Sequence, residues 1–434
     1  MKKLIEYINK HVLVKVASLQ MASVSTRIIA GLLTSKAIAV FIGAEGMAVI
    51  GNLRNFVSSF QSISILGFYK GVVKYISRFK DDVSELSKTI STVFYSGFIA
   101  TILVSVFCYF NAEAINNVIF PNYNNYTLVI RVFAIVLPFY ALNMFSFSIM
   151  NGFSKYKILI IINIIGQILS VSVALLLIYQ ERLKGALISV AIAESLIFLI
   201  TLVGVTNRRS LVPLISANKF SYGLFKKLSS YSAMALFTTI ILPLVAIAIR
   251  SYIIENIGYK DAGFWEAMTR ISKYYLMFIT SIMTLYILPR FNEINSAEEF
   301  RKEVFSFYKT VIPILTVGLL AIYLLKPIIV SVILTDEFEP VEGLFLWQLL
   351  GDFIKVLSMV LAFQFIAKKM FWHYVLTEAF LIVILYASSI YFLNYFDNVK
   401  GAVIAHFVSY TIYFMVILTI FGKSLFGNVR EKTI

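Results

Sequence analysis

The sequence predicts an all-α membrane protein with about twelve transmembrane helices, a prediction that rests on three observations. Of its 434 residues, 59% are hydrophobic and only 14% are charged, and the mean hydropathy is +0.85. A soluble domain with so few charges would lack a wettable surface, so composition places the chain in the membrane class. The apolar residues also form long runs, and the lysines and arginines between these runs alternate regularly.

Each predicted span is an apolar run bounded by charged or turn-forming residues. A transmembrane helix needs about 20 predominantly apolar residues, and twelve runs of this kind follow one another along the chain. They cover residues 12–38, 47–70, 89–110, 127–150, 157–179, 185–206, 228–254, 262–289, 305–326, 341–366, 372–393 and 399–421. The first run follows three lysines but is too long for a cleaved signal peptide, so we interpret it as the first span.

The widest gap between apolar runs divides the chain into two halves. We expect residues 1–206 to form an N-terminal six-helix bundle and residues 207–227 a cytoplasmic connecting loop. Residues 228–434 would form a C-terminal six-helix bundle with a short cytoplasmic tail. Two related halves with a substrate path at their interface are a common transporter layout. Because residue-level similarity between the halves is weak, this repeat is inferred from the number of spans.

The lysines and arginines predict the orientation in the membrane. Twenty-five of them lie in the N-terminal segment, in the loops after every second span and in the C-terminal tail, whereas five lie in the opposite loops. The positive-inside rule therefore places both termini in the cytoplasm. The same alternation argues against a nucleic-acid partner, which would require the basic residues to cluster on one surface.

Eight further basic residues fall inside predicted spans or at their edges: Arg27, Lys36, Arg54, Arg131, Arg250, Arg270, Lys273 and Lys355. Only four acids lie at comparable depth: Glu194, Glu266, Asp352 and Glu378. Each charge costs about 2.5–3.5 kcal/mol at the centre of a bilayer. We therefore expect the basic residues to face a water-filled cavity or the interior of the helix bundle rather than lipid. They would line a central cationic cavity between the two bundles.

Helical spacing places several of these charges on polar stripes of otherwise apolar helices. The stripes are Gln20, Ser23, Arg27 and Thr34; Arg54, Ser58 and Gln61; Glu266, Arg270 and Lys273; and Gln348, Asp352 and Lys355. An alternative is that Glu266–Arg270 and Asp352–Lys355 are structural ion pairs within one helix. Four arginines have no acid within reach along their own helix, which favours the cavity interpretation for them: Arg27, Arg54, Arg131 and Arg250.

The residue types indicate an anionic substrate. A guanidinium keeps its charge when buried, and its fork of donors fits phosphate oxygens in pairs. Such a cavity suits a diphosphate and disfavours an organic cation. Glu194, Asp352 and Glu378 are candidates for coupling to a proton or cation, although a helix–helix hydrogen bond is the alternative for Glu194 and Glu378.

The sequence offers no signal for catalysis or for a cofactor. It contains no nucleotide-binding Gly-x-x-x-x-Gly-Lys-Ser/Thr loop, so ATP is not expected to drive it directly. His11, His373 and His406 are scattered along the chain and form no metal-ligand pattern. Cys108 is the only cysteine, which excludes intrachain disulfides and cysteine-rich zinc sites.

Several segments carry a family resemblance. Residues 344–356 (LFLWQLLGDFIKV), continuing to 364–368 (QFIAK), resemble the tenth span of the Wzx-type flippases for lipid-linked oligosaccharides. Similar agreement occurs at residues 31–48, 51–54, 71–75, 234–250, 263–265 and 271–272. The chain is thereby identified as a member of the polysaccharide transporters of the multidrug/oligosaccharidyl-lipid/polysaccharide exporter superfamily.

The resemblance implies two six-helix bundles arranged in a V about a central cavity. The implied substrate is an undecaprenyl-diphosphate-linked oligosaccharide of the O-antigen or lipid III type. It would be turned across the bacterial inner membrane by alternating access coupled to an ion gradient. Membrane lipids, a polysaccharide polymerase and chain-length proteins are the implied partners. The residues in matching segments are Arg27, Lys36, Arg54, Arg250, Asp352 and Lys355, whereas Arg270 and Lys273 rest on the physical argument alone.

Two other classes of function remain alternatives. A cation-coupled multidrug antiporter of the same superfamily would require an acid-rich cavity, whereas the excess here is basic. A membrane-embedded glycosyltransferase or polymerase usually needs a large extramembrane loop with catalytic carboxylates, and the predicted outer loops are short. We therefore expect a transporter rather than an enzyme.

Overall fold

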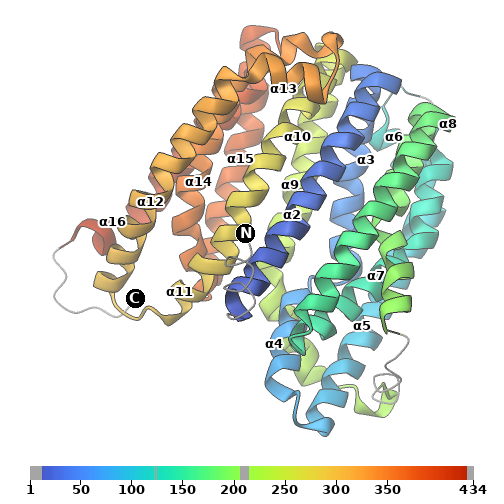
Figure 1. Cartoon of the computed structure of the whole chain (residues 1–434), viewed down its shortest axis with the longest axis vertical. Helices are drawn as coiled ribbons and strands as arrows, with labels where there is room; N and C mark the ends of the chain where they lie inside the picture. Colours follow the sequence, from blue (N-terminus) through green and yellow to red (C-terminus); the bar gives the residue numbers. More distant parts are fainter. Residues whose placement is uncertain (1–11, 122, 124, 206–214, 428–434) are drawn as a thin grey trace, which may run out of the picture. The chain divides into compact units, whose positions relative to one another are not determined.

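The computed structural model describes residues 12–121, 123, 125–205 and 215–427, and these residues form helices and no β-strand (Figure 1). Ten of the described helices are long and apolar enough to cross a membrane. The predicted all-α membrane class is therefore confirmed. The number of twelve spans stays a prediction, because one of the ten helices is a folded hairpin and the more polar helix α3 is not among them.

The chain forms two compact units. The first comprises the chain up to Ile42 and Val49–Ile247, and the second comprises Gly43–Ala48 and the chain from Ala248 onward. The predicted boundary lay in the loop 207–227, whereas the units divide inside α9. The two six-helix bundles with the predicted boundaries remain a prediction.

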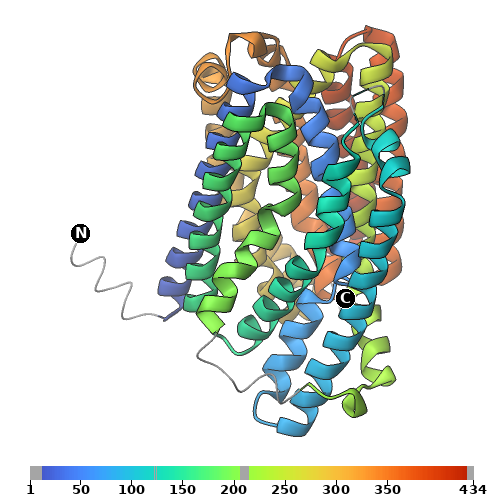
Figure 2. The ribbon, with the colours of Figure 1, turned by 90° about the vertical axis from the view of Figure 1, so that its right-hand side faces the viewer.

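The first unit contains α2 (Val12–Phe41), most of α3 (Gly43–Ser64), α4 (Tyr69–Phe79), α5 (Val83–Phe110), α6 (Ala112–Ile119), α7 (Thr127–Gly152), α8 (Tyr156–Val205), the short helix η2 (Ala217–Lys219) and α9 (Tyr222–Asn256) as far as Ile247. Helix α8 packs against both α2 and α7 (Figure 2). The predicted span 47–70 is divided, because Leu66 and Gly67 adopt left-handed backbone angles that end α3 and allow α4 to begin at Tyr69.

Helix α8 doubles back on itself. Arg182 has a non-helical backbone (φ 51°, ψ −124°) at the turn. The hydroxyl of Ser170 donates to the carbonyl of Ala193 over 2.9 Å, so the segments before and after Arg182 lie side by side. Close approach at the turn requires a glycine, because a Cβ on Gly185 would lie 1.9 Å from the carbonyl oxygen of Leu177. The two arms correspond to the predicted spans 157–179 and 185–206.

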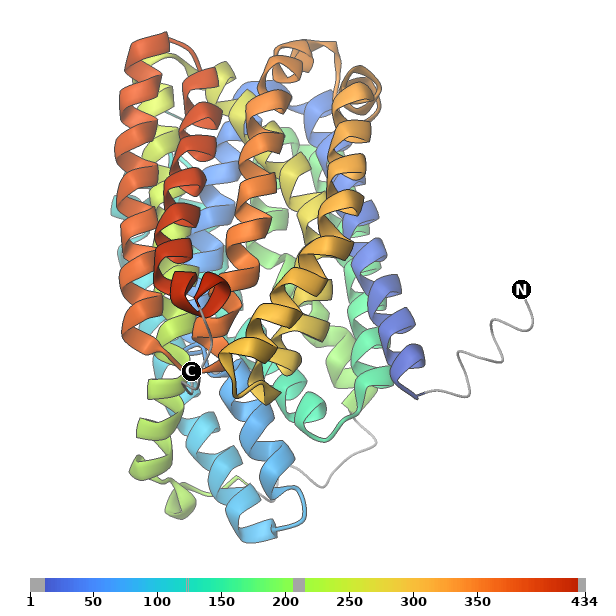
Figure 3. The ribbon, with the colours of Figure 1, turned by 90° about the vertical axis from the view of Figure 1, so that its left-hand side faces the viewer.

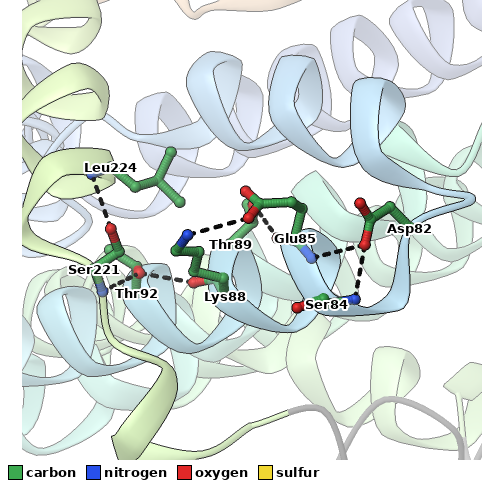
Figure 4. A network of polar contacts seen from close by, with 8 residues as sticks. All are labelled: Asp82, Ser84, Glu85, Lys88, Thr89, Thr92, Ser221 and Leu224. Atoms are coloured by element: carbon green, nitrogen blue, oxygen red, sulfur yellow. Dashed lines mark hydrogen bonds and ion pairs between the residues drawn. The ribbon is translucent and has the colours of Figure 1, made fainter.

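Polar contacts attach the start of α9 to α5 (Figure 4). Asp82 caps α5 by accepting hydrogen bonds from the backbone amides of Ser84 and Glu85, at 2.9 and 3.1 Å. About two turns further along α5, the backbone amide of Ser221 donates to the hydroxyl of Thr92 over 3.0 Å. Part of the predicted connecting loop, residues 207–214, lies outside the described residues. The described remainder is attached to the first unit and continues into α9.

The second unit contains the rest of α9, α10 (Tyr259–Ile282), the π-helical turn η3 (Met283–Ile287), α11 (Leu288–Glu293), α12 (Ala297–Leu324), α13 (Lys326–Ile333), η4 (Asp336–Leu344), α14 (Phe345–Ala367), α15 (Phe371–Phe396) and α16 (Lys400–Phe426). Helix α16 packs against both α14 and α15, and these three helices run side by side in Figure 3. Helix α14 also contacts α10 and α12. This packing surrounds α14 and buries its polar stripe.

Candidate functional site

A buried carboxylate on α14 is the centre of a polar cluster in the second unit. Asp352 is 0% exposed and accepts four hydrogen bonds. The donors are the hydroxyls of Ser272, at 2.5 Å, and Tyr275, the amide nitrogen of Gln348, at 3.2 Å, and Nε2 of His406, at 3.0 Å. Because an ionised carboxylate accepts about four hydrogen bonds, these donors satisfy Asp352 in its charged form.

The imidazole of His406 reaches Asp352 from α16. Its side chain is 15% exposed, whereas the carboxylate is fully buried. The residue before Asp352 makes this approach possible, because a Cβ on Gly351 would lie 2.4 Å from Cδ2 of His406. The other face of the ring lies 4.7 Å from the ring of Tyr410, measured between centroids. His406 was not a candidate on sequence, because no pattern along the chain pairs α16 with α14.

The cluster extends from Asp352 to α15 through tyrosines. The ammonium of Lys355 lies 5.2 Å from the ring centroid of Tyr410. Tyr413 lies one turn along α16 and donates its hydroxyl to Oε1 of Glu378 over 2.7 Å. Lys355 also interacts electrostatically with both Asp352 and Glu378. The coupling candidates Asp352 and Glu378 thus belong to one cluster.

A second buried cluster joins α9 to α10. Arg250 and Glu266 form an ion pair with a nitrogen–oxygen distance of 2.5 Å, and each side chain is 2% exposed. The guanidinium of Arg250 lies 5.2 Å from the ring centroid of Trp265. Sequence spacing had paired Glu266 with Arg270 and left Arg250 without an acid. That pairing is wrong, because the acid binds the arginine of the neighbouring helix.

Arg270 is buried beside this pair without a hydrogen bond of its own. It lies one turn along α10 from Glu266 and is 2% exposed. None of its three guanidinium nitrogens has a hydrogen-bond partner among the described residues. A buried charge that lacks a partner is costly. Arg270 is therefore a buried cation, among the described residues, whose three guanidinium nitrogens are available to an anionic ligand.

The alternative of an Asp352–Lys355 ion pair within one helix is not what the described residues show. Asp352 instead pairs with His406, over 3.0 Å, and Lys355 lies over the ring of Tyr410. Spacing along one helix could not reveal either partner, since both lie on α16.

The remaining predicted residues lie at the surface or are partly buried. Arg27, Arg131, Lys273 and Glu194 are exposed on α2, α7, α10 and α8, whereas Lys36 and Arg54 are partly buried on α2 and α3. The guanidinium of Arg131 lies 5.7 Å from the ring centroid of Tyr109. Four of the eight basic candidates belong to the first unit and four to the second. Their convergence on one cavity stays a prediction.

An apolar pocket adjoins the Asp352 cluster. It has a volume of about 200 Å³ and is lined by side chains of α10 and α12, including Ile279, Val311 and Leu315. Tyr275 lines the same pocket and donates its hydroxyl to Asp352. Tyr275 thus contacts the apolar pocket with its ring and the buried carboxylate with its hydroxyl.

Known proteins resemble the chain over almost its whole length. It is 27% identical over 405 residues to the lipid III flippase of Escherichia coli (strain K12), which covers 92% of this chain and 96% of the relative. It is 24% identical over 295 residues to a putative O-antigen transporter of Shigella flexneri, covering 64% and 67% of the two chains. The resemblance inferred from sequence is therefore confirmed.

Solved structures show the same fold. The inward-facing structure of a multidrug resistance MATE family transporter of the MOP superfamily matches with a TM-score of 0.72 and 13% identity, covering 93% of this chain and 96% of that one. The MATE multidrug transporter DinF-BH matches with a TM-score of 0.68 and 14% identity, covering 95% and 96%. A family model described as polysaccharide biosynthesis protein matches residues 39–342, and the chain belongs to this family.

Proposed function

We propose that the chain is a flippase that moves an undecaprenyl-diphosphate-linked oligosaccharide, of the lipid III or O-antigen type, from the cytoplasmic to the periplasmic leaflet. The observation that carries this proposal is the similarity to the lipid III flippase of Escherichia coli, which extends over 92% of this chain and 96% of the relative. The chain would act in the bacterial inner membrane with both termini in the cytoplasm. It would work by alternating access and draw energy from an ion gradient.

The charges of the second unit support a diphosphate as the recognised group. Arg270 is buried and offers unused guanidinium donors, and Arg250 lies on the neighbouring helix in its pair with Glu266. Guanidinium groups bind phosphate oxygens through charge-assisted hydrogen bonds. Arg27, Lys36, Arg54, Arg131, Lys273 and Lys355 would add positive charge along the path of the substrate. A polysaccharide polymerase and chain-length proteins would act on the flipped product.

The alternative of a cation-coupled multidrug antiporter has the fold in its favour, since the MATE transporters share it. Sequence identities of 13% and 14% support a shared fold but not a shared substrate. Eight basic residues against four acids in the predicted spans disfavour an organic cation as the substrate. The relatives that resemble the chain in sequence are a flippase and a putative O-antigen transporter.

Reconstitution of the purified protein tests this function directly. Liposomes would contain a fluorescent undecaprenyl-diphosphate oligosaccharide, and a membrane-impermeant glycosidase would report its appearance in the outer leaflet. We expect accelerated translocation compared with protein-free liposomes, together with restored glycan synthesis in a bacterium that lacks its lipid III flippase. Absence of both, with folded protein in the membrane, would refute the proposal. Efflux of an organic cation instead would identify the antiporter.

A further inference from the structure

The Asp352–His406 pair joins α14 to α16 and contains a group that can change its charge. The carboxylate is fully buried and the imidazole is 15% exposed, so access from outside the cluster leads through His406. Imidazole is the side chain whose charge ordinarily changes between pH 5 and 8. A histidine bonded to a carboxylate can therefore take up a proton and keep it as a buried ion pair.

The charged groups around the Asp352–His406 pair favour the binding of one additional proton. Asp352 and Glu378 contribute two negative charges, and Lys355 contributes one positive charge. If both carboxyl groups are ionised and the imidazole is neutral, the cluster carries one excess negative charge, and a proton on His406 would cancel it next to Asp352. A net charge in an apolar interior is unfavourable, so this arrangement favours proton uptake.

The other titratable groups packed around α14 do not alter this balance of charge. They are Tyr275 of α10, Tyr308 of α12, Tyr410 and Tyr413 of α16, and His373 of α15, whose exposed ring stacks on Phe365. The charged residues of α10 are Glu266 with Arg250, the buried Arg270, the exposed Lys260 and Lys273, and the partly buried Asp261 in the first turn of the helix. Arg290 of α11 and Tyr286 of η3 bind Glu303, and the acids Asp336, Glu337 and Glu339 of η4 are exposed.

We propose that the Asp352–His406 pair is the proton-binding site that couples the second unit to a proton gradient. One proton binds to the imidazole, pairs as imidazolium with the carboxylate, and is released later in the cycle; only this N–H bond forms and breaks. The proposal deepens the flippase function proposed above and rests on it. Gly351 has a positioning role, since it leaves the space that brings the ring to the carboxylate.

Transport measurements separate coupling from movement of the substrate. The reconstituted parent protein and its His406→Gln variant would be compared in three assays. The first measures flipping driven by an imposed pH gradient, and the second measures substrate-driven proton movement with a trapped pH-sensitive dye. The third measures exchange of lipid-linked oligosaccharide between the leaflets without a gradient. We expect His406→Gln to reduce the rate of proton movement and the rate of gradient-driven flipping at least tenfold. The rate of exchange without a gradient should stay at the parental value. His373→Gln is the matched control, because His373 is exposed on α15.

The outcomes are distinguishable. Proton movement and gradient response equal to those of the parent in His406→Gln would overturn the proton site. Loss of exchange together with coupling, in a protein of parental thermal stability, would also overturn it, because it would show a role in substrate movement. If the parent itself flips no oligosaccharide, the proposed function fails, and the proton site is then decided by a measurement that needs no transport.

Nuclear magnetic resonance of labelled histidine provides that measurement. The chain contains three histidines, so the variant His11→Gln/His373→Gln leaves His406 as the only labelled imidazole. We expect this imidazole to gain its second proton as the pH is lowered across the range of the assay. The Asp352→Asn change in the same background removes the carboxylate partner of His406 and serves as its matched control. An unchanged protonation state across the range in the parent would refute the proposal.

Discussion

The two buried arginines of the second unit should respond in opposite ways to replacement by methionine. Arg250 is bonded to Glu266 over 2.5 Å, and both side chains are 2% exposed. Removing one partner of a buried ion pair leaves the other charge uncompensated and costs about 3–5 kcal/mol. We therefore expect Arg250→Met to lower the free energy of unfolding by that amount.

Arg270→Met should leave the protein as stable as the parent or more stable. The guanidinium of Arg270 is buried without a hydrogen bond among the described residues, so its removal breaks no such contact. Replacing buried charges by apolar side chains of similar volume is neutral or stabilising by about 1–4 kcal/mol. Flipping should nevertheless fall about ten- to hundredfold per folded molecule, because a hydrogen bond to a charged group contributes about 1.5–3 kcal/mol.

Unfolding by denaturant in mixed micelles would measure the free energy of unfolding. Reconstitution in liposomes would measure the flipping rate per folded molecule. Lys273→Met is a matched control for stability, because Lys273 lies on the same helix at an exposed position. Its free energy of unfolding should stay within about 0.5 kcal/mol of the parent. The reasoning fails if Arg270→Met destabilises the protein as much as Arg250→Met, or if it flips substrate at the parental rate.

Three further predictions concern coupling, substrate and topology. Tyr275→Phe removes a donor to Asp352 but keeps the ring in the apolar pocket, so we expect weaker proton coupling with unchanged exchange; parental coupling would contradict this. Arg54→Lys should keep part of the flipping that Arg54→Ala loses, since lysine keeps the charge but not the guanidinium fork; equal activities would argue against phosphate binding there. In a Cys108→Ala background, a cysteine at Lys80 should be labelled only from the cytoplasmic side and one at Asp397 only from outside. The reverse labelling would overturn the proposed orientation.

The sequence predicts the long apolar helices better than the residues at which those helices begin. Hydropathy placed the start of the third span at residue 89 and that of the ninth at residue 305, whereas α5 begins at Val83 and α12 at Ala297. In both cases a capping residue sets the start: Asp82 accepts from the amide of Glu85, and Ser296 from that of Glu299. The polar first turns continue the helix beyond the apolar run, so hydropathy does not detect them.

The candidate site was predicted in its residue types but not in its pairings. Periodicity selects residues on one face of one helix; of the charges it selected on α10 and α14, Glu266, Arg270 and Asp352 are buried, whereas Lys273 is exposed. Their partners come from other helices: Arg250 lies 16 residues before Glu266, and His406 lies 54 residues after Asp352. Such contacts depend on how α9, α10, α14 and α16 pack, which a single sequence does not specify.

Helix α10 connects the two clusters of the second unit, and this connection provides a physical basis for coupling. One part of the helix carries Glu266 and Arg270, and the next turn carries Ser272 and Tyr275, which donate to Asp352. An anion bound to Arg270 and a proton bound at the Asp352 cluster would therefore act on the same helix. Linkage requires that if the proton changes the affinity for the anion, the anion changes the affinity for the proton by the same factor. We therefore expect substitutions at Arg270 to alter the pH dependence of substrate binding as well as its strength.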